Sequence, residues 1–313
     1  MMKLGIIGMN EGNGHPFSYS AIFNGYDPEE LKRRCPFKLI QEYLPREHNN
    51  KVFIESAKVT HIWTQDKQLS EDVARVSLIP NIVDQMEEMI DEVDAVILAR
   101  DDPWNHLKMA MPFLKKRIPI FIDKQLVANS QDLEELLKYT SDDYPIMAGS
   151  SMRFTRDVLI AKEKCSNLMI KSIHGMSRVS WLRYGHHLLE GIVPIFGYDI
   201  DWVRSLRTKP YHDIVQIQFS TGLNVILEFI EDIHLPIQFT CYSEKYAPYP
   251  VLFQDFFYSF REMMIRFVQL AKSGEKAFPF DEMIGIAKIV LAGDISKKAD
   301  GKKINPVTLA CIE

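Results

Sequence analysis

The chain has 313 residues, which is too long for one ordinary hydrophobic core and fits two domains. Apolar residues make up 46% and charged residues 25%, the balance of a soluble globular protein. A net charge of −5 gives no general attraction to nucleic acid or anionic lipid, so we expect neither as a partner.

The four cysteines carry no CxxC spacing, which excludes a zinc ribbon and argues against a disulfide scaffold. The N-terminus shows no signal-peptide h-region with a cleavage site. No apolar run approaches the ~20 residues that a membrane span needs. We therefore expect a soluble, cytoplasmic protein.

The first half alternates short apolar runs with helical patterns, which is typical of βαβ units and a parallel sheet. Strands are expected at residues 4–8, 58–64, 81–83, 95–99, 119–122 and 146–148. Helices are expected at 18–24, 70–77, 84–90, 104–116 and 130–139, with an inserted helix and loop within 26–56. Ser70 is the expected N-cap of its helix. This order predicts a Rossmann-type doubly wound sheet with right-handed crossovers.

The second half shows longer alternating stretches, at residues 170–179, 214–219, 224–230 and 237–242. Thr221-Gly222 predicts a hairpin turn between the second and third of them. Helices are expected at 253–273 and 280–295. This half indicates an α+β domain with a largely antiparallel open sheet. We expect a dinucleotide-binding domain over 1–125 and a substrate-binding, catalytic and oligomerisation domain over 126–313.

A glycine-rich segment, Gly8-Met-Asn-Glu-Gly12-Asn-Gly14-His15, directly follows the first expected strand. Dinucleotide sites need glycines there, so that the backbone can approach the pyrophosphate at the N-terminus of the next helix. Asn10 and Asn13 occupy two positions of the usual GxGxxG pattern, although asparagine tolerates a left-handed backbone. A purely structural turn is the alternative interpretation.

An acidic residue at the end of the second strand would bind the ribose hydroxyls of NAD. That position holds Thr64, followed by Gln65 and Asp66. Asp66 can bind the ribose hydroxyls only if the strand runs two residues further. If no acid stands at the strand end, one obstacle to binding NADP is removed. Both NAD and NADP therefore stay open.

The pair Asp123-Lys124 ends an apolar strand, and strand carboxyl ends face the ligand crevice in open α/β sheets. An ammonium there could bind a substrate hydroxyl. The alternative is a solvated pair at the start of a loop.

A further candidate is the segment 181–191, WLRYGHHLLEG, because a histidine can take the proton of an alcohol as hydride leaves carbon. On a helix, His186 and Glu190 stand at i and i+4, a spacing that could hold a metal. No third ligand stands at a motif spacing, so we expect no metal. A histidine that caps or packs at a domain interface is the plainer alternative.

Together these segments resemble the Gfo/Idh/MocA family of NAD(P)-dependent oxidoreductases along nearly the whole chain. Residues 4–15 look like its first strand and phosphate turn. The segments 94–106 (DAVILARDDPWNH) and 120–126 are similar to its fourth strand with a trailing histidine and to its "EKP" segment. Residues 147–154 (MAGSSMRF) resemble the entry to its second domain, and 184–190 its "GxHxxD" helix. The regions 259–274 and 280–297 fit its closing helices.

The resemblance implies that Lys124 is the catalytic lysine and His187 the catalytic histidine. The family's acid, four residues before that histidine, falls on Arg183, which cannot act as a base near neutral pH but can bind a carboxylate or phosphate. The proline of "EKP" is replaced by Gln125. The expected substrate-binding residues are Arg153, Arg183 and Tyr184. The expected cofactor-binding residues are Gly8, Met9, Asn10, Gly12, Asn13, Gly14, His15, Thr64, Asp66, Arg100, Asp101, His106 and Asp123.

These observations predict an enzyme that moves hydride between NAD or NADP and a carbinol or ketone of a sugar, sugar acid or nucleotide sugar. Lys124 and His187 are expected to converge on the reacting oxygen. The rival hypothesis is a non-catalytic sensor or scaffold of the same fold that binds NAD(P) or another ligand, and a third is an enzyme acting on a non-sugar carbonyl. In the resembled family the open sheet face pairs subunits, which implies a homodimer or homotetramer.

Overall fold

The computed structural model describes residues 1–48, 54–141, 143–165, 168–209, 212–231 and 236–310. The chain forms two compact units that interleave along the sequence. The first unit comprises Met1–Leu126, Glu135–Ala148 and Phe260–Ala277, and the second comprises Val127–Glu134, Gly149–Ser259 and Phe278–Glu313. The single division between residues 125 and 126 stays a prediction.

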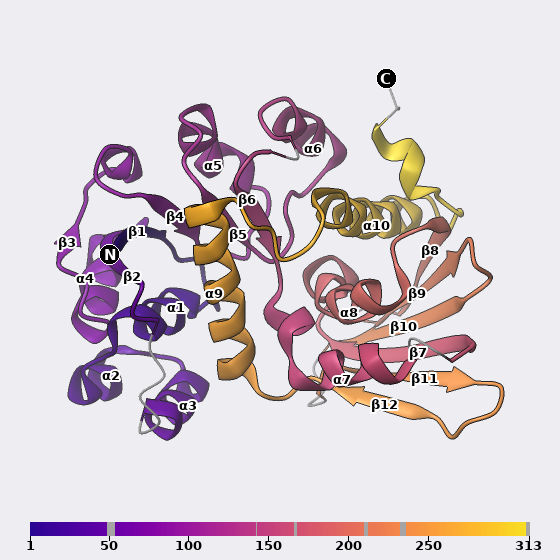
Figure 1. Ribbon diagram of the computed structural model, residues 1–313. Helices are drawn as coiled ribbons and strands as arrows, with labels where there is room; N and C mark the ends of the chain where they lie inside the picture. The colour runs from indigo at the N-terminus through magenta and orange to yellow at the C-terminus, as the bar shows by residue number, and fades with distance from the viewer. Residues whose placement is uncertain (49–53, 142, 166–167, 210–211, 232–235, 311–313) are drawn as a thin grey trace. The chain divides into compact units, whose positions relative to one another are not determined.

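The first unit is built on a sheet of order β3-β2-β1-β4-β5-β6 (Figure 1). The strands are β1 Met2–Ile7, β2 Ala57–Trp63, β3 Asn81–Ile82, β4 Ala95–Leu98, β5 Ile120–Asp123 and β6 Ile146–Gly149. The β3–β2, β2–β1, β1–β4 and β4–β5 pairings are parallel. This is the strand order of a Rossmann fold, and it confirms the predicted doubly wound sheet.

The central strands of this sheet are apolar throughout, because a parallel sheet is covered on both faces. All four residues of β4 and all four of β5 are buried. Leu4, Ile6 and Ile7 of β1 are buried as well. The strands therefore hold their carboxyl ends in fixed positions at one edge of the sheet.

Two helices of the first unit begin earlier than predicted. α1 covers His15–Asn24, and α4 covers Lys67–Val76. The expected N-cap Ser70 is wrong: Asp66 caps α4 by accepting a hydrogen bond of 2.8 Å from the Gln68 N–H. Ser70 instead accepts the Thr64 N–H at 2.9 Å, which binds the helix to the end of β2.

The segment expected as one inserted helix contains two helices, α2 Pro28–Arg34 and α3 Lys38–His48. Asp27 caps α2, and Pro28 occupies its first turn, where no donor is lost. Arg34 of α2 forms an ion pair of 2.5 Å with Asp72 of α4. The first unit also contains α5 His106–Lys115 and the 3-10 helix η1 Met86–Met89, which replaces the short helix expected at 84–90. The helix α6, Ser130–Leu137, is divided between the units, with residues 130–134 in the second.

The second unit is built on a sheet of order β12-β11-β7-β10-β9-β8. Its strands are β7 Ile170–Arg178, β8 Ile200–Lys209, β9 His212–Phe219, β10 Asn224–Ile230, β11 Gln238–Ser243 and β12 Tyr249–Leu252. Only the β7–β10 pairing is parallel among those that join the described strands. The largely antiparallel sheet and the hairpin at Gly222 (φ 90°) are confirmed, whereas β8 and β12 were not predicted.

The helices of the second unit cover one face of this sheet. They are η2 Ser151–Phe154, α7 Arg156–Cys165, α8 Trp181–Phe196, α10 Phe280–Lys298 and η3 Pro306–Ala310. Trp181 of α8 packs edge-on against Phe229 of β10 at 5.5 Å and donates to the Val290 carbonyl of α10 at 3.0 Å. Along β9 and β10 buried residues alternate with half-buried ones, so the opposite face stays open.

The helix α9, Phe256–Ser273, belongs mostly to the first unit, which the sequence did not predict. Phe267 of α9 packs against Phe121 of β5 with ring centroids 5.9 Å apart. Cys35, Cys165 and Cys241 are buried free cysteines. Within the described ranges, every helix is too short or too polar to cross a bilayer.

Candidate functional site

The glycine-rich turn follows β1 at the point where the strand order of the first sheet reverses. A Cβ on Gly8 would overlap the Pro16 ring, so only glycine lets α1 start so close to the end of β1. Gly12 has φ 81°, and a Cβ there would meet nothing within 4 Å. The turn therefore lies at the switch point where doubly wound sheets bind ligands, and its Gly12 side is open.

The N-terminus of α1 is less available to an anion than the sequence predicts. The His15 N–H donates to the Asn13 side chain at 2.8 Å, and Pro16 has no N–H. The Phe17 N–H donates to the Gly14 carbonyl at 3.1 Å. A Cβ on Gly14 would lie 2.6 Å from atoms of Phe37 and Ile40, so neighbouring side chains fill that side of the turn. An anion here must use the backbone around Gly12.

A buried carboxylate joins this turn to the end of β5. Asp123 is 1% exposed and accepts hydrogen bonds from Tyr19 Oη at 3.1 Å and Asn13 Nδ2 at 3.4 Å, and its Oδ2 also bonds His15 Nδ1. Burial alone would raise the pKa of Asp123, but His15 and Lys124 outweigh it and hold that pKa below its ordinary value. Burial, together with the Asp123 charge, raises the pKa of Tyr19. Asp123 is thus an anion that fixes the turn.

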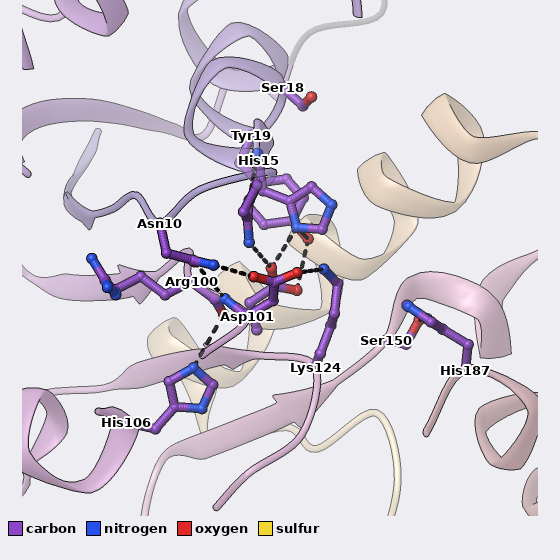
Figure 2. A network of polar contacts seen from close by, with 12 residues as sticks. Asn10, His15, Ser18, Tyr19, Arg100, Asp101, His106, Lys124, Ser150 and His187 are labelled. Atoms are coloured by element: carbon purple, nitrogen blue, oxygen red, sulfur yellow. Dashed lines mark hydrogen bonds and ion pairs between the residues drawn. The ribbon is translucent and has the colours of Figure 1, made fainter. Parts of the chain in front are cut away.

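Lys124 lies beside the turn, as Figure 2 shows. Its Nζ forms an ion pair of 3.0 Å with Asp101 Oδ2, and Asn10 donates to the other oxygen of that carboxylate. The Asp101 N–H returns a bond of 3.0 Å to Asn10 Oδ1. Lys124 has φ 55°, a conformation that a non-glycine residue keeps only where its surroundings impose it. The ammonium is therefore held in one position.

Arg100 and His106 form buried hydrogen bonds within the first unit, next to the glycine-rich turn and the end of β5. Arg100 forms a two-pronged ion pair with Asp102 at 2.7 and 2.5 Å and donates to the Met9 carbonyl at 3.1 Å and Gln65 Oε1 at 3.0 Å. His106 is fully buried, with Nδ1 2.8 Å from the Gln125 carbonyl and Nε2 3.1 Å from the Arg100 carbonyl. Burial lowers the pKa of His106. Both side chains are engaged by the protein, and their expected cofactor role stays a prediction.

No carboxylate stands directly after β2. Thr64 occupies that position, is buried, and has its Oγ1 2.9 Å from Ser70 Oγ. Asp66 lies three residues beyond the end of β2 and caps α4. The geometry therefore leaves the choice between NAD and NADP open.

The candidate residues of the second unit lie on the first half of α8 or next to it. His187 Nδ1 lies 2.6 Å from Ser150 Oγ, and its ring meets the Tyr184 ring edge-on at 5.0 Å. Arg183 is exposed. Ser150 was not among the expected site residues, since a serine after a strand carries no signal of its own.

Glu190 holds a buried charge cluster next to His187. It accepts from His186 Nε2 at 2.9 Å and from the Ser150 N–H at 3.3 Å, and Arg153 Nε bonds its other oxygen. Arg153 also pairs with Glu282 at 2.7 Å. Burial would raise the pKa of Glu190, but Arg153 and His186 lower it below its ordinary value. Arg153 is 6% exposed and pairs with both carboxylates, and its expected role in substrate binding stays a prediction.

The His186–Glu190 pair is thus joined by a hydrogen bond of 2.9 Å, and its carboxylate is also bound by Arg153. No group of three or more His, Cys, Asp or Glu side chains among the described residues is placed to hold a metal ion.

Residues 40–143 match the Gfo/Idh/MocA family model, which describes an oxidoreductase family with an NAD-binding Rossmann fold. The resemblance to the Gfo/Idh/MocA family is confirmed. The matched segment runs from α3 to just before β6 and carries Asp101, Asp123 and Lys124. This segment is therefore similar to an NAD-binding oxidoreductase domain, as expected. No curated protein matches the chain.

Solved structures share the fold of both units. A probable dehydrogenase from Thermotoga maritima has a TM-score of 0.72 at 14% identity and covers 98% of this chain and 100% of its own. The apo scyllo-inositol dehydrogenase from Lactobacillus casei has a TM-score of 0.75 at 13% identity, with 98% of each chain covered. The same enzyme with bound NAD(H) and scyllo-inositol has a TM-score of 0.73 at 13% identity and covers 98% and 99%. At these identities the likeness establishes the two-domain fold.

Proposed function

We propose that the chain is an NAD(P)-dependent oxidoreductase that moves hydride between a nicotinamide cofactor and a carbinol or ketone carbon of a sugar, sugar acid or nucleotide sugar. The observation that carries this proposal is the Lys124 ammonium, held 3.0 Å from Asp101 beside the glycine-rich turn at the switch point of the sheet. The scyllo-inositol dehydrogenase of the same fold, solved with NAD(H) and scyllo-inositol, supports a polyol-like substrate.

The turn fits a dinucleotide on its Gly12 side. The open space beside Gly12 lets a pyrophosphate approach the backbone, and Asn10 adds a side-chain amide nearby. When bound, the nicotinamide ring supplies the hydride acceptor or donor. Asp123 keeps the turn in place through Asn13 and His15.

Lys124 and His187 carry the proton and charge chemistry. Lys124 donates a hydrogen bond to the substrate oxygen and stabilises the negative charge that develops on it. Asp101 orients the ammonium through its ion pair of 3.0 Å. His187 accepts the hydroxyl proton during oxidation and returns it during reduction, a role that suits an imidazole near neutral pH.

Arg183 sets the substrate class in this proposal. Arg183 is an exposed residue on the same helix as His187. A guanidinium can bind a carboxylate or phosphate through two parallel hydrogen bonds. We therefore propose an anionic sugar, either a sugar acid or a nucleotide sugar, as the substrate.

The test is a titration of NADH and NADPH by nicotinamide fluorescence, followed by a screen of neutral sugars, sugar acids and nucleotide sugars. We expect binding of at least one cofactor, and turnover that Lys124→Ala abolishes. Cofactor binding without turnover of any substrate would instead favour a sensor or scaffold of the same fold. The occupied N–H groups at the start of α1 favour that second candidate. Absence of cofactor binding would refute the proposal that the chain is an NAD(P)-dependent enzyme.

We further propose that the open face of the second sheet pairs subunits into a homodimer or homotetramer. That face carries half-buried apolar side chains, including Met176, Ile214 and Ile226, between polar ones. Leu206 and Tyr242, 37% and 38% exposed, extend the apolar surface. Sedimentation equilibrium of the full chain tests this, and a monomer would contradict it.

A further inference from the structure

Ser150 lies at the junction between β6 and η2, where it caps η2 and is almost fully buried. It contacts α8 twice. Its N–H donates to Glu190 Oε1 at 3.3 Å, and its Oγ lies 2.6 Å from His187 Nδ1 (Figure 2). His187 and Glu190 are three residues apart on one helix, so these two bonds fix Ser150 against a single helix face.

The number of hydrogen bonds that the Ser150 hydroxyl can form bears on which group donates in its bond with the imidazole. A serine hydroxyl has one hydrogen and accepts two hydrogen bonds. The Met152 N–H already donates to Ser150 Oγ at 3.3 Å. The hydroxyl keeps one lone pair and its hydrogen, so by itself it can either accept from or donate to His187 Nδ1. Because Nδ1 faces the buried Ser150, the base role proposed for His187 falls to Nε2, and Nε2 is basic only when the proton is on Nδ1 and the hydroxyl accepts it.

We propose that Ser150 is the positioning residue of His187, which rests on the proposed function. Ser150 Oγ accepts the Nδ1 proton, selects the tautomer in which Nε2 is unprotonated, and holds the ring plane together with the Tyr184 edge. The substrate hydroxyl proton then goes to Nε2 and leaves an imidazolium whose Nδ1–H still donates to Ser150. In the reverse direction the same Nε2 proton returns to the substrate oxygen.

The neighbouring residue supplies a matched control. Ser151 is buried in the same short helix, and its Oγ is bonded to Ser259 Oγ at 3.2 Å rather than to a histidine. Ser151→Ala therefore removes a buried hydroxyl one residue away without touching His187. Ser150→Thr keeps a hydroxyl at the positioning site.

The first measurement does not depend on activity. Long-range proton–nitrogen correlation spectra of the full chain labelled with ¹⁵N-histidine report the tautomer of each imidazole. We expect His187 of the wild type, Ser150→Thr and Ser151→Ala to carry its proton on Nδ1, and Ser150→Ala to lose that preference. A wild-type His187 protonated on Nε2, or an unchanged spectrum in Ser150→Ala, overturns the proposal.

The second measurement is steady-state kinetics on the best substrate of the screen. Ser150→Ala is expected to lower kcat by about tenfold to a hundredfold while the KM for cofactor changes little, because orientation and not binding is lost. Ser150→Thr should recover most of kcat, and Ser151→Ala should match the wild type. Equal kcat in the two alanine variants overturns the role of Ser150 and leaves the proposed function intact. A wild type that neither binds cofactor nor turns over overturns the proposed function, and the spectra still decide the Ser150–His187 bond.

Discussion

Replacing Asp123 by asparagine tests whether a single buried charge holds the glycine-rich turn. The carboxylate accepts bonds from Tyr19, Asn13 and His15 in a fully buried setting. A bond to a charged acceptor contributes about 1 kcal/mol more than a neutral one, so three bonds give a loss of about 2–3 kcal/mol. The lowered pKa of Asp123 means that contacts with the anion outweigh its desolvation, which makes the change destabilising.

The assay is urea denaturation of the wild type and Asp123→Asn followed by circular dichroism, with hydrogen exchange measured over the turn at residues 8–15. Asp143→Asn is the matched control, because Asp143 is exposed and its ion pair with Arg117 spans 3.4 Å. We expect the control to change the free energy of unfolding by less than about 0.5 kcal/mol. If Asp123→Asn behaves like the control, with unchanged exchange in the turn, the reasoning about the buried charge is refuted.

The same prediction has a pH dependence of defined sign. The folded-state pKa of Asp123 lies below its ordinary value, so its contribution is fully present above that ordinary value, about 4. It is lost as pH falls through the folded-state pKa. The stability advantage of the wild type over Asp123→Asn should therefore be constant near neutral pH and shrink in acid, whereas an advantage that grows in acid contradicts the assignment.

The remaining predictions concern the proposed reaction and the turn. Lys124→Ala and His187→Ala should each lower kcat by about 10²–10⁴-fold, with the Kd for NAD(P)H nearly unchanged, and near-normal turnover in either variant would mean that its role is misassigned. Arg183→Ala should weaken turnover of acidic sugars far more than of neutral ones, and equal losses on both classes argue against an anionic substrate. Gly8→Ala should cost about 1–3 kcal/mol of stability, because its Cβ would overlap the Pro16 ring, and a variant with wild-type urea midpoint would show that α1 can shift.

Several elements follow from local pattern alone. The apolar runs of β1, β4 and β5 indicate strands that are buried on both faces. The alternation along β9 and β10 indicates strands that are buried on one face. Each pattern can be recognised in the strand's own sequence. The turn at Gly222 needs a residue that tolerates positive φ, and the sequence supplies one. The order of strands and helices was enough to predict the doubly wound sheet.

Other features depend on which distant segments meet, and local periodicity carries no information about that. The part of α9 from Phe260 onward packs in the first unit because Phe267 reaches Phe121 of β5, more than a hundred residues earlier in the chain. From the sequence, Asp123 can be either a ligand-binding or a solvated residue at a strand end. Its burial becomes visible only when α1 brings Tyr19 and His15 onto it. Ser150 meets His187 only because the residues that follow β6 pack against α8. Burial and hydrogen-bond partners give these side chains their chemistry, and both are set by tertiary packing.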